Sequence, residues 1–192
     1  HGVGPSIVEP THRGPEFMEV AAQAEPDLRR LVSIPDDYAV LFLQGGATGQ
    51  FAGIPLNLTT PDSVIDFVNT GAWSKKATGE AKRYANVNAA ADAGEPYASI
   101  PAVSEWKVSP NAAYVHYTPN ETIGGVEFHF IPKSSVPLIA DMSSTILSRP
   151  VDVSKFGLIY AGAQKNMGPS GLTVVIVGDD LVGKGRPGTP AV

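Results

Sequence analysis

Short apolar runs recur along most of the chain, and segments of helical length separate several of them. The last four runs are continuously apolar rather than alternating, which is typical of strands buried on both faces of a sheet. We therefore expect an α/β domain with a mainly parallel sheet and flanking helices. The predicted strands cover residues 39–46, 63–71, 86–91, 112–118, 136–144, 157–162 and 171–178.

Helical spacing is clearest near the beginning of the chain, over residues 15–33. Apolar residues including Phe17, Leu28 and Leu31 recur there at intervals of three and four, which predicts an amphipathic helix. Pro26 falls within this segment and lacks a backbone N–H, so we expect a kink there or a break into two helices. Further helices are predicted after the first and second strands.

Composition and charge narrow the classes of function. Hydrophobic residues make up 43% of the 192 residues and charged residues 17%, which describes a soluble globular chain and favours one large domain. The net charge of -5 would repel a phosphate backbone, so nucleic acid is not an expected partner. The apolar runs are too short to cross a bilayer, so no membrane association is expected either.

The chain contains no cysteine, which excludes disulfides, thiolate metal sites and cysteine nucleophiles and suits the cytoplasm. Its beginning, HGVGPSIVEP, shows no signal-peptide pattern and no initiator Met. Its end, GRPGTPAV, stops in turn residues. We expect residues 1–192 to be one domain of a longer protein, truncated at both ends.

Ligands of parallel α/β sheets bind at the carboxyl ends of the strands. One such end carries QGGATGQF, residues 44–51, between a predicted strand and a predicted helix. Glycines permit a tight turn there, and the free N–H groups of a first helical turn favour an anion such as phosphate. An ordinary glycine-rich turn explains the stretch equally well, because neither the Walker nor the Rossmann spacing is present.

Two ionisable residues also follow apolar strands. Asp141 ends one strand, where a carboxylate needs a cation or several donors, although it could simply cap the segment that follows. Lys165 ends the next strand, where partial burial would lower the pKa of its amine and favour a nucleophile or Schiff-base former. A surface lysine with a solvated head is the alternative.

Three more residues have ordinary explanations when each is taken alone. Trp73 could be a core residue, Thr122 a turn residue and Arg13 a surface charge. Together with the glycine turn, Asp141 and Lys165, however, Trp73 and Thr122 supply the parts that hold pyridoxal phosphate. These parts are a phosphate site, a flat ring to stack on, a carboxylate for the pyridine nitrogen, a hydroxyl and an amine.

The sequence motifs of the chain resemble those of the phosphoserine aminotransferases, a family of fold-type I enzymes that depend on pyridoxal phosphate. The resemblance runs over nearly the whole chain and is most specific around Lys165. It rests on the blocks THRGPEF, FLQGGATGQFAGIPLNL, TGAWSKKA, EAKRY, YVHYTPNETIGGVEF, ADMSSTILSRPVDVSKFGLIYAGAQKNMGPSGLTVVIV and DDLVGK.

The resemblance implies a role for each matching position. Lys165 matches the catalytic Schiff-base lysine, and Arg13 matches the arginine that binds the α-carboxylate of the substrate. The positions that match cofactor-binding residues are Ala47, Thr48, Trp73, Thr122, Asp141, Gln164 and Lys165. No metal is implied.

The family reaction implied is transamination between glutamate and 3-phosphohydroxypyruvate, which gives phosphoserine and 2-oxoglutarate in serine biosynthesis. A related step in pyridoxine biosynthesis, a cytoplasmic location and a homodimer with shared active sites are also implied. The chain would be the large cofactor-binding domain, without the small C-terminal domain. Thr48 stands where some members carry Arg, so phosphate binding here would depend more on backbone N–H groups.

Two other hypotheses use the same residues. Another fold-type I enzyme would share the lysine chemistry but not the phosphorylated substrate. A nucleotide-binding α/β module would use the glycine turn for phosphate and need no covalent chemistry at Lys165.

Overall fold

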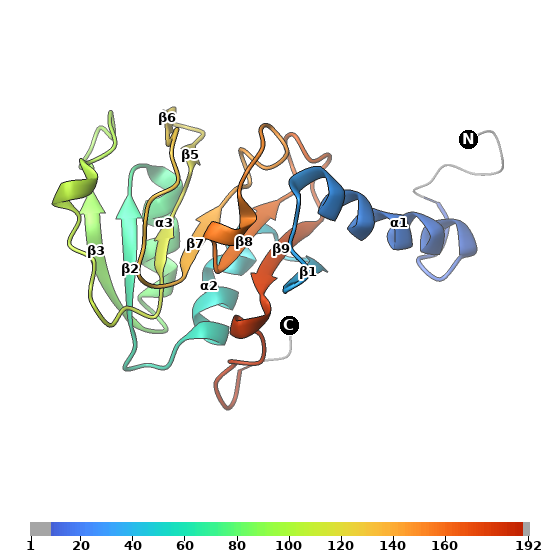
Figure 1. The fold of residues 1–192 in the computed structure, drawn as a ribbon, viewed down its shortest axis with the longest axis horizontal. Helices are drawn as coiled ribbons and strands as arrows, with labels where there is room; N and C mark the ends of the chain where they lie inside the picture. Colours follow the sequence, from blue (N-terminus) through green and yellow to red (C-terminus); the bar gives the residue numbers. More distant parts are fainter. Residues whose placement is uncertain (1–8, 190–192) are drawn as a thin grey trace.

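The computed structural model describes residues 9–189, which form a seven-stranded mixed sheet with helices packed against it (Figure 1). The strand order is β1-β9-β8-β7-β4-β2-β3. The strands are β1 (Tyr38–Leu43), β2 (Val64–Asn69), β3 (Asn86–Asp92), β4 (Val115–Tyr117), β7 (Leu138–Asp141), β8 (Leu158–Gly162) and β9 (Thr173–Gly178). Each of the seven predicted strands is present, so the expected α/β class is confirmed.

Strand direction divides the sheet into two parts. The five strands β3, β2, β4, β7 and β8 run parallel, whereas β9 is antiparallel to both β8 and β1. Parallel neighbours need a crossover of a dozen or more residues, and the loop 163–172 between β8 and β9 is too short for one. The expectation of a mainly parallel sheet is therefore confirmed, with one strand reversed for a physical reason.

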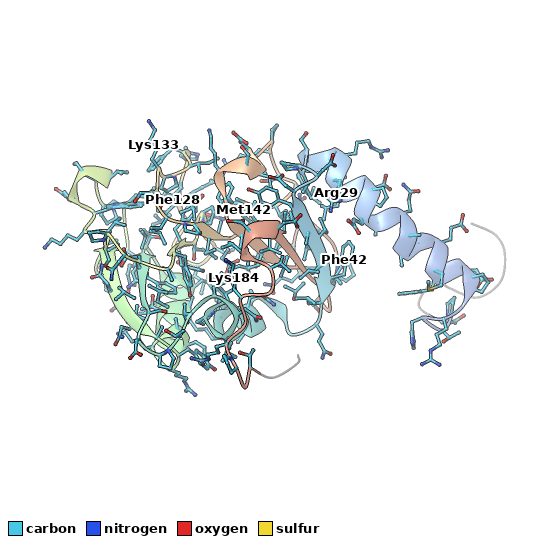
Figure 2. The ribbon with its side chains drawn as sticks, turned by 60° about the horizontal axis from the view of Figure 1, so that its bottom comes forward. Arg29, Phe42, Phe128, Lys133, Met142 and Lys184 are labelled. Carbon is cyan, nitrogen blue, oxygen red and sulfur yellow. The ribbon has the colours of Figure 1, made fainter. Side chains whose placement is uncertain are left out.

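Two helices cover one face of the sheet, α2 (Gly46–Leu58) and α3 (Ala72–Ala81). Their buried residues, such as Phe51, Ile54 and Ala77, belong to the same core cluster as Tyr160 of β8. A second core cluster includes Leu28 and Met142 (Figure 2). The remaining elements are a small hairpin and three short 3-10 helices: β5 (Asn120–Glu121), β6 (Val126–Glu127), η1 (Val103–Glu105), η2 (Val153–Lys155) and η3 (Asp179–Leu181).

The first helix, α1 (Pro15–Val32), remains a single element although Pro26 lies inside it, so of the two outcomes expected there, a kink or a break, the break into two helices is wrong. Its last turns are tied to the domain by the Arg29 guanidinium, which donates to the backbone oxygens of Pro35 at 3.2 Å and Tyr38 at 2.8 Å (Figure 2). These contacts fix the end of the helix to the segment that enters β1.

The amphipathic face expected of α1 is only partly buried in this chain. Leu28 packs in the core, but Phe17 and Leu31 are exposed, and the beginning of the helix projects away from the sheet (Figure 1). Among the described residues, no helix combines the length and apolar character that a membrane span requires.

Candidate active site

The functional side chains gather at one edge of the sheet. The carboxyl ends of β1, β2, β4, β7 and β8 all point to this edge, because β1 and β8 are each antiparallel to β9 and so run in the same direction. A cavity of ≈ 250 Å³ opens there. Its lining comprises Gly46, Ala47, Thr48, Trp73, Lys76, Thr118, Asn120, Thr122, Asp141, Ser143, Ser144, Gly162, Ala163, Gln164, Lys165, Ser170, Gly171 and Leu172.

Seven of the eight site residues expected from the sequence line this single cavity. They are Ala47, Thr48, Trp73, Thr122, Asp141, Gln164 and Lys165, which are separated by up to 118 positions along the chain. Arg13 is not among the lining residues. It is exposed, just before the projecting helix α1, and its backbone N–H donates to the nearby Thr11 hydroxyl. Within this chain, the structure does not bring Arg13 to the site.

Asp141 forms the floor of the cavity at the end of β7 and is only 5% exposed. Its Oδ1 accepts hydrogen bonds from the backbone N–H of Ser143 at 3.0 Å and from the Ser143 hydroxyl at 2.6 Å. Burial raises the pKa of Asp141, and these hydrogen bonds act in the opposite direction. The carboxylate is therefore well oriented but lacks a cationic partner among the described residues, and a bound cation would stabilise it strongly.

Lys165 follows β8 and is exposed rather than partly buried, so the expectation of a desolvated amine is wrong for this chain. Its Nζ nevertheless does not point into open solvent. It donates to the Thr122 hydroxyl at 2.7 Å across the cavity, which holds the amine beside the residue expected to contact the same ligand. Lys165 stands three residues after the end of β8, in the short loop that connects β8 to the antiparallel strand β9.

The beginning of α2 forms an anion site on the opposite side of the cavity. Gly45 and Gly46 adopt the left-handed conformation, with φ of 95° and 62°, which turns the chain sharply from β1 into the helix. The first-turn N–H groups, including those of Ala47 and Thr48, have no acceptor within the helix and suit a phosphate. A Cβ on Gly162 would lie 2.9 Å from the Ala47 nitrogen, so this cradle requires glycine at the end of β8.

Trp73 lies at the start of α3 and presents a half-buried ring to the cavity. The Lys76 ammonium sits 5.7 Å from the centroid of this ring, in cation–π contact. Lys76 therefore adds a positive charge to the lining that the sequence did not single out.

Glu121 fixes the position of Trp73 through its backbone. This fully buried carboxylate accepts hydrogen bonds from the backbone N–H groups of Trp73 at 2.9 Å and Ser74 at 2.8 Å, so it caps the N-terminus of α3. A Cβ on Gly71 would come within 2.4 Å of the Glu121 side chain, which explains the glycine there. Because Thr122 is its neighbour, one turn places both the helix cap and the hydroxyl that contacts Lys165.

Substitution of Glu121 by glutamine is expected to destabilise the protein by about 2–3 kcal/mol, because an amide NH₂ would then face one of two helix N–H donors. The midpoint of urea unfolding measures this effect, and the affinity for pyridoxal phosphate should fall in parallel as Trp73 shifts. Glu95→Gln is the matched control, since Glu95 makes an exposed ion pair with Lys75. Equal midpoints for the two variants would show that Glu121 does not hold α3.

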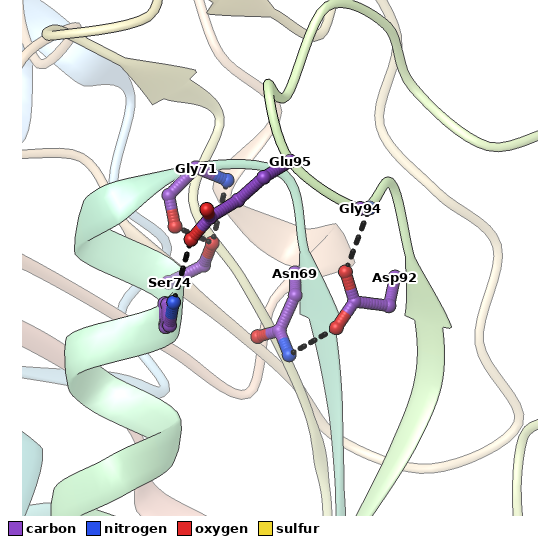
Figure 3. Close-up of polar contacts among 7 residues, drawn as sticks. Asn69, Gly71, Ser74, Asp92, Gly94 and Glu95 are labelled. Carbon is purple, nitrogen blue, oxygen red and sulfur yellow. Dashed lines mark hydrogen bonds and ion pairs between the residues drawn. The ribbon is translucent and has the colours of Figure 1, made fainter.

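A second set of polar contacts fastens the strand ends beside the site (Figure 3). The Asn69 amide donates to Asp92 at 3.3 Å, and Asp92 also accepts from the Gly94 backbone N–H at 2.8 Å. The Ser74 hydroxyl accepts from the Gly71 backbone N–H at 3.1 Å. These contacts link the ends of β2 and β3 and stabilise the start of α3, at the edge of the sheet where the cavity opens.

Sequence reasoning missed several of the residues that build the site, notably Glu121, Ser143 and Lys76. The signal for Ser143 was its position two residues after Asp141, the spacing at which a serine can return a hydrogen bond to an aspartate. Glu121 carried a weaker signal, a carboxylate in the turn just after a buried strand. Its partner helix lies 47 residues away in sequence, so no local pattern could reveal it.

The residues present fit pyridoxal phosphate. Asp141 is a buried carboxylate without a cationic partner, which a protonated ring nitrogen would supply. Lys165 is an amine suited to an aldehyde, Trp73 offers a ring face, and the start of α2 offers free N–H groups for a phosphate. No acidic residue stands in the first turn of α2 to oppose that anion.

Comparison with known proteins agrees with a site for pyridoxal phosphate. The family model for aminotransferase class V matches residues 5–191, so the chain belongs to the class-V aminotransferase family. The phosphoserine aminotransferase of Ectopseudomonas mendocina (strain ymp) is 58% identical over 100% of this chain and 54% of its own length. The chain thus spans about half the length of the curated relatives it matches.

Solved structures show the same relationship. Phosphoserine aminotransferase from Bacillus circulans subsp. alkalophilus is 48% identical and superposes with a TM-score of 0.90, covering 96% of this chain and 52% of that chain. The phosphoserine aminotransferase from Trichomonas vaginalis, described as PLP bound, is 42% identical with a TM-score of 0.89 over 96% of this chain and 53% of that chain. The chain therefore shares its fold with about half of each of these pyridoxal-phosphate-dependent aminotransferases.

Proposed function

We propose that this chain is the cofactor-binding part of a phosphoserine aminotransferase. The protein would transfer an amino group between glutamate and 3-phosphohydroxypyruvate, with phosphoserine and 2-oxoglutarate as the other pair. The observation that carries the proposal is the meeting of Lys165, Asp141, Trp73 and the start of α2 around one cavity. The names of relatives at 58–60% identity support the choice of substrates.

Each residue has a role that its contacts support. Lys165 would hold the cofactor covalently and, once released, move the proton at the α-carbon of the substrate. Thr122, which already accepts a hydrogen bond from the amine, would orient that proton transfer. When bound, pyridoxal phosphate supplies an electron-withdrawing ring that makes the α-carbon proton of an amino acid removable.

The remaining lining residues would bind and orient. Asp141 would hold the ring nitrogen in its protonated form, and Trp73 would stack on the ring. Ala47 and Thr48 would bind the phosphate through their backbone N–H groups, and Gln164 would contact the cofactor beside Lys165.

We also propose a cytoplasmic homodimer in which residues 1–192 contribute the large domain. The exposed apolar residues at the beginning of α1, such as Phe17, Met18 and Val20, support a partner surface on this projecting helix. Arg13, at the start of the same helix, would then bind a substrate carboxylate in the partner's cavity rather than in its own. Serine biosynthesis, and a related step in pyridoxine biosynthesis, would be the pathways served.

The substrate assignment is tested with the full-length protein loaded with pyridoxal phosphate. Phosphoserine is expected to convert the bound cofactor to its amine form at a rate at least about 100-fold higher than alanine at equal concentration, because a site built for a charged group rejects a ligand without it. Absorbance of the cofactor follows the conversion.

The control for this assay is glutamate, which should react as the second substrate. Equal rates with phosphoserine and alanine would favour another fold-type I enzyme over the proposed activity.

A further inference from the structure

A buried histidine and tyrosine lie directly behind Asp141 and have no part in the proposed reaction. His116 of β4 is 3% exposed and Tyr160 of β8 is fully buried. The His116 Nε2 atom and the Tyr160 hydroxyl are 2.9 Å apart. Tyr160 is also the register partner of Asp141 on the neighbouring parallel strand β7, so the two side chains project from the same face of the sheet. The Tyr160 hydroxyl counteracts the rise that burial causes in the pKa of Asp141.

The chemistry of the three groups sets the direction of the hydrogen bonds. An ionised carboxylate can only accept, so a hydrogen bond between Tyr160 and Asp141 requires the tyrosine to donate its single hydroxyl hydrogen to the carboxylate. The tyrosine oxygen then accepts from the N–H at Nε2 of a neutral His116. Burial lowers the pKa of His116 to about 3, which keeps the ring neutral over the working range.

Aromatic packing fixes the orientation of the His116 and Tyr160 rings. The His116 ring stacks on Phe67 with centroids 4.6 Å apart and an interplanar angle of 26°. Tyr160 makes an edge contact with Phe51 of α2 at 6.3 Å. The Nδ1 atom of His116 has no hydrogen-bond partner in the described part of the chain, so the ring makes its only such bond to Tyr160.

We propose that Tyr160 and His116 are positioning residues that act through Asp141. They would form a one-way chain of hydrogen bonds, from His116 to Tyr160 to Asp141, which orients the carboxylate toward the cavity and stabilises its ionised form. The inference rests on the proposed function, because its target is the ring nitrogen of pyridoxal phosphate. The ligand chemistry it favours is a protonated ring nitrogen facing Asp141.

The test compares two cofactors that differ only at that nitrogen. Dissociation constants of the full-length protein are measured, by quenching of tryptophan fluorescence, for pyridoxal phosphate and for its 1-deaza analogue, in which carbon replaces the ring nitrogen. Tyr160→Phe should weaken pyridoxal phosphate roughly tenfold, as expected for the loss of a hydrogen bond to a charged group, and weaken the analogue less than about twofold.

Tyr114→Phe is the matched control. Tyr114 is a buried tyrosine in the same core cluster as Tyr160, but no hydrogen bond links it to Asp141, so neither dissociation constant should change. His116→Phe, which keeps the stack on Phe67, should lower the affinity for pyridoxal phosphate in the same direction. The double variant with Tyr160→Phe should be no weaker than Tyr160→Phe alone, because His116 reaches Asp141 only through Tyr160.

Equal losses for the two cofactors in Tyr160→Phe would assign a merely structural role to the tyrosine and overturn the inference. Unchanged binding of pyridoxal phosphate in that variant would do the same, and the proposed function would stand. If the unsubstituted protein binds neither cofactor, the proposed function fails, and the inference fails with it.

Discussion

Replacement of Lys165 by alanine is expected to lower the rate of amino-group transfer by about 10⁴-fold or more, because it removes both the covalent anchor and the base. The fold should persist, since the side chain is exposed and makes a single hydrogen bond, to Thr122. No other lysine takes its place, because the other lysine in the cavity lining, Lys76, lies over the ring of Trp73.

The covalent site can be mapped directly. The full-length protein is loaded with pyridoxal phosphate, reduced with borohydride and digested, and the modified peptide should contain Lys165 in the original protein and be missing in Lys165→Ala. Lys75→Ala is the matched control, because Lys75 pairs with Glu95 outside the cavity and should change neither the label nor the rate.

Modification of Lys75 or Lys76 instead would contradict the assignment. Full ligand affinity in Lys165→Ala, with no label in either protein, would favour the nucleotide-binding module that needs no covalent chemistry.

Asp141→Asn is expected to lower the transfer rate at least about 100-fold while leaving the cofactor bound. An asparagine has nearly the same shape but no charge to hold the ring nitrogen in its protonated form, and loss of one partner from a buried ion pair typically costs 3–5 kcal/mol. The hydrogen bonds from Ser143 to Oδ1 can be kept, so the local backbone should not move.

Single-turnover rates with glutamate measure this effect, and the cofactor content of the purified variant verifies that binding persists. Asp152→Asn is the matched control, because Asp152 is exposed and pairs only with its neighbours Ser154 and Lys155. Near-normal turnover in Asp141→Asn would show that the carboxylate does not act on the ring nitrogen.

Much of the fold could be predicted from local patterns alone. The apolar runs located all seven strands of the sheet, and the four continuously apolar runs became the fully buried strands β4, β7, β8 and β9. The same runs drew attention to the glycine turn, Asp141 and Lys165 near strand ends, the resemblance added Gln164, and all of these line the cavity. Three details failed for identifiable reasons. Helix α1 is not divided at Pro26, Lys165 is exposed, and Arg13 lies away from the cavity; each depends on how distant parts of the chain pack, which local patterns do not record.

By itself, the sequence determined the α/β class, the positions of Asp141 and Lys165 after buried strands, and the glycine turn before α2, because these depend on residues close together in the chain. Only the tertiary structure decided how they combine. Lys165, after β8, meets Thr122, after β5 and 43 residues away; Glu121 caps a helix 47 residues away; and His116 of β4 meets Tyr160 of β8 across the strand β7 that carries Asp141. Each of these contacts joins separate strands or helices, and their geometry exists only once the sheet has formed.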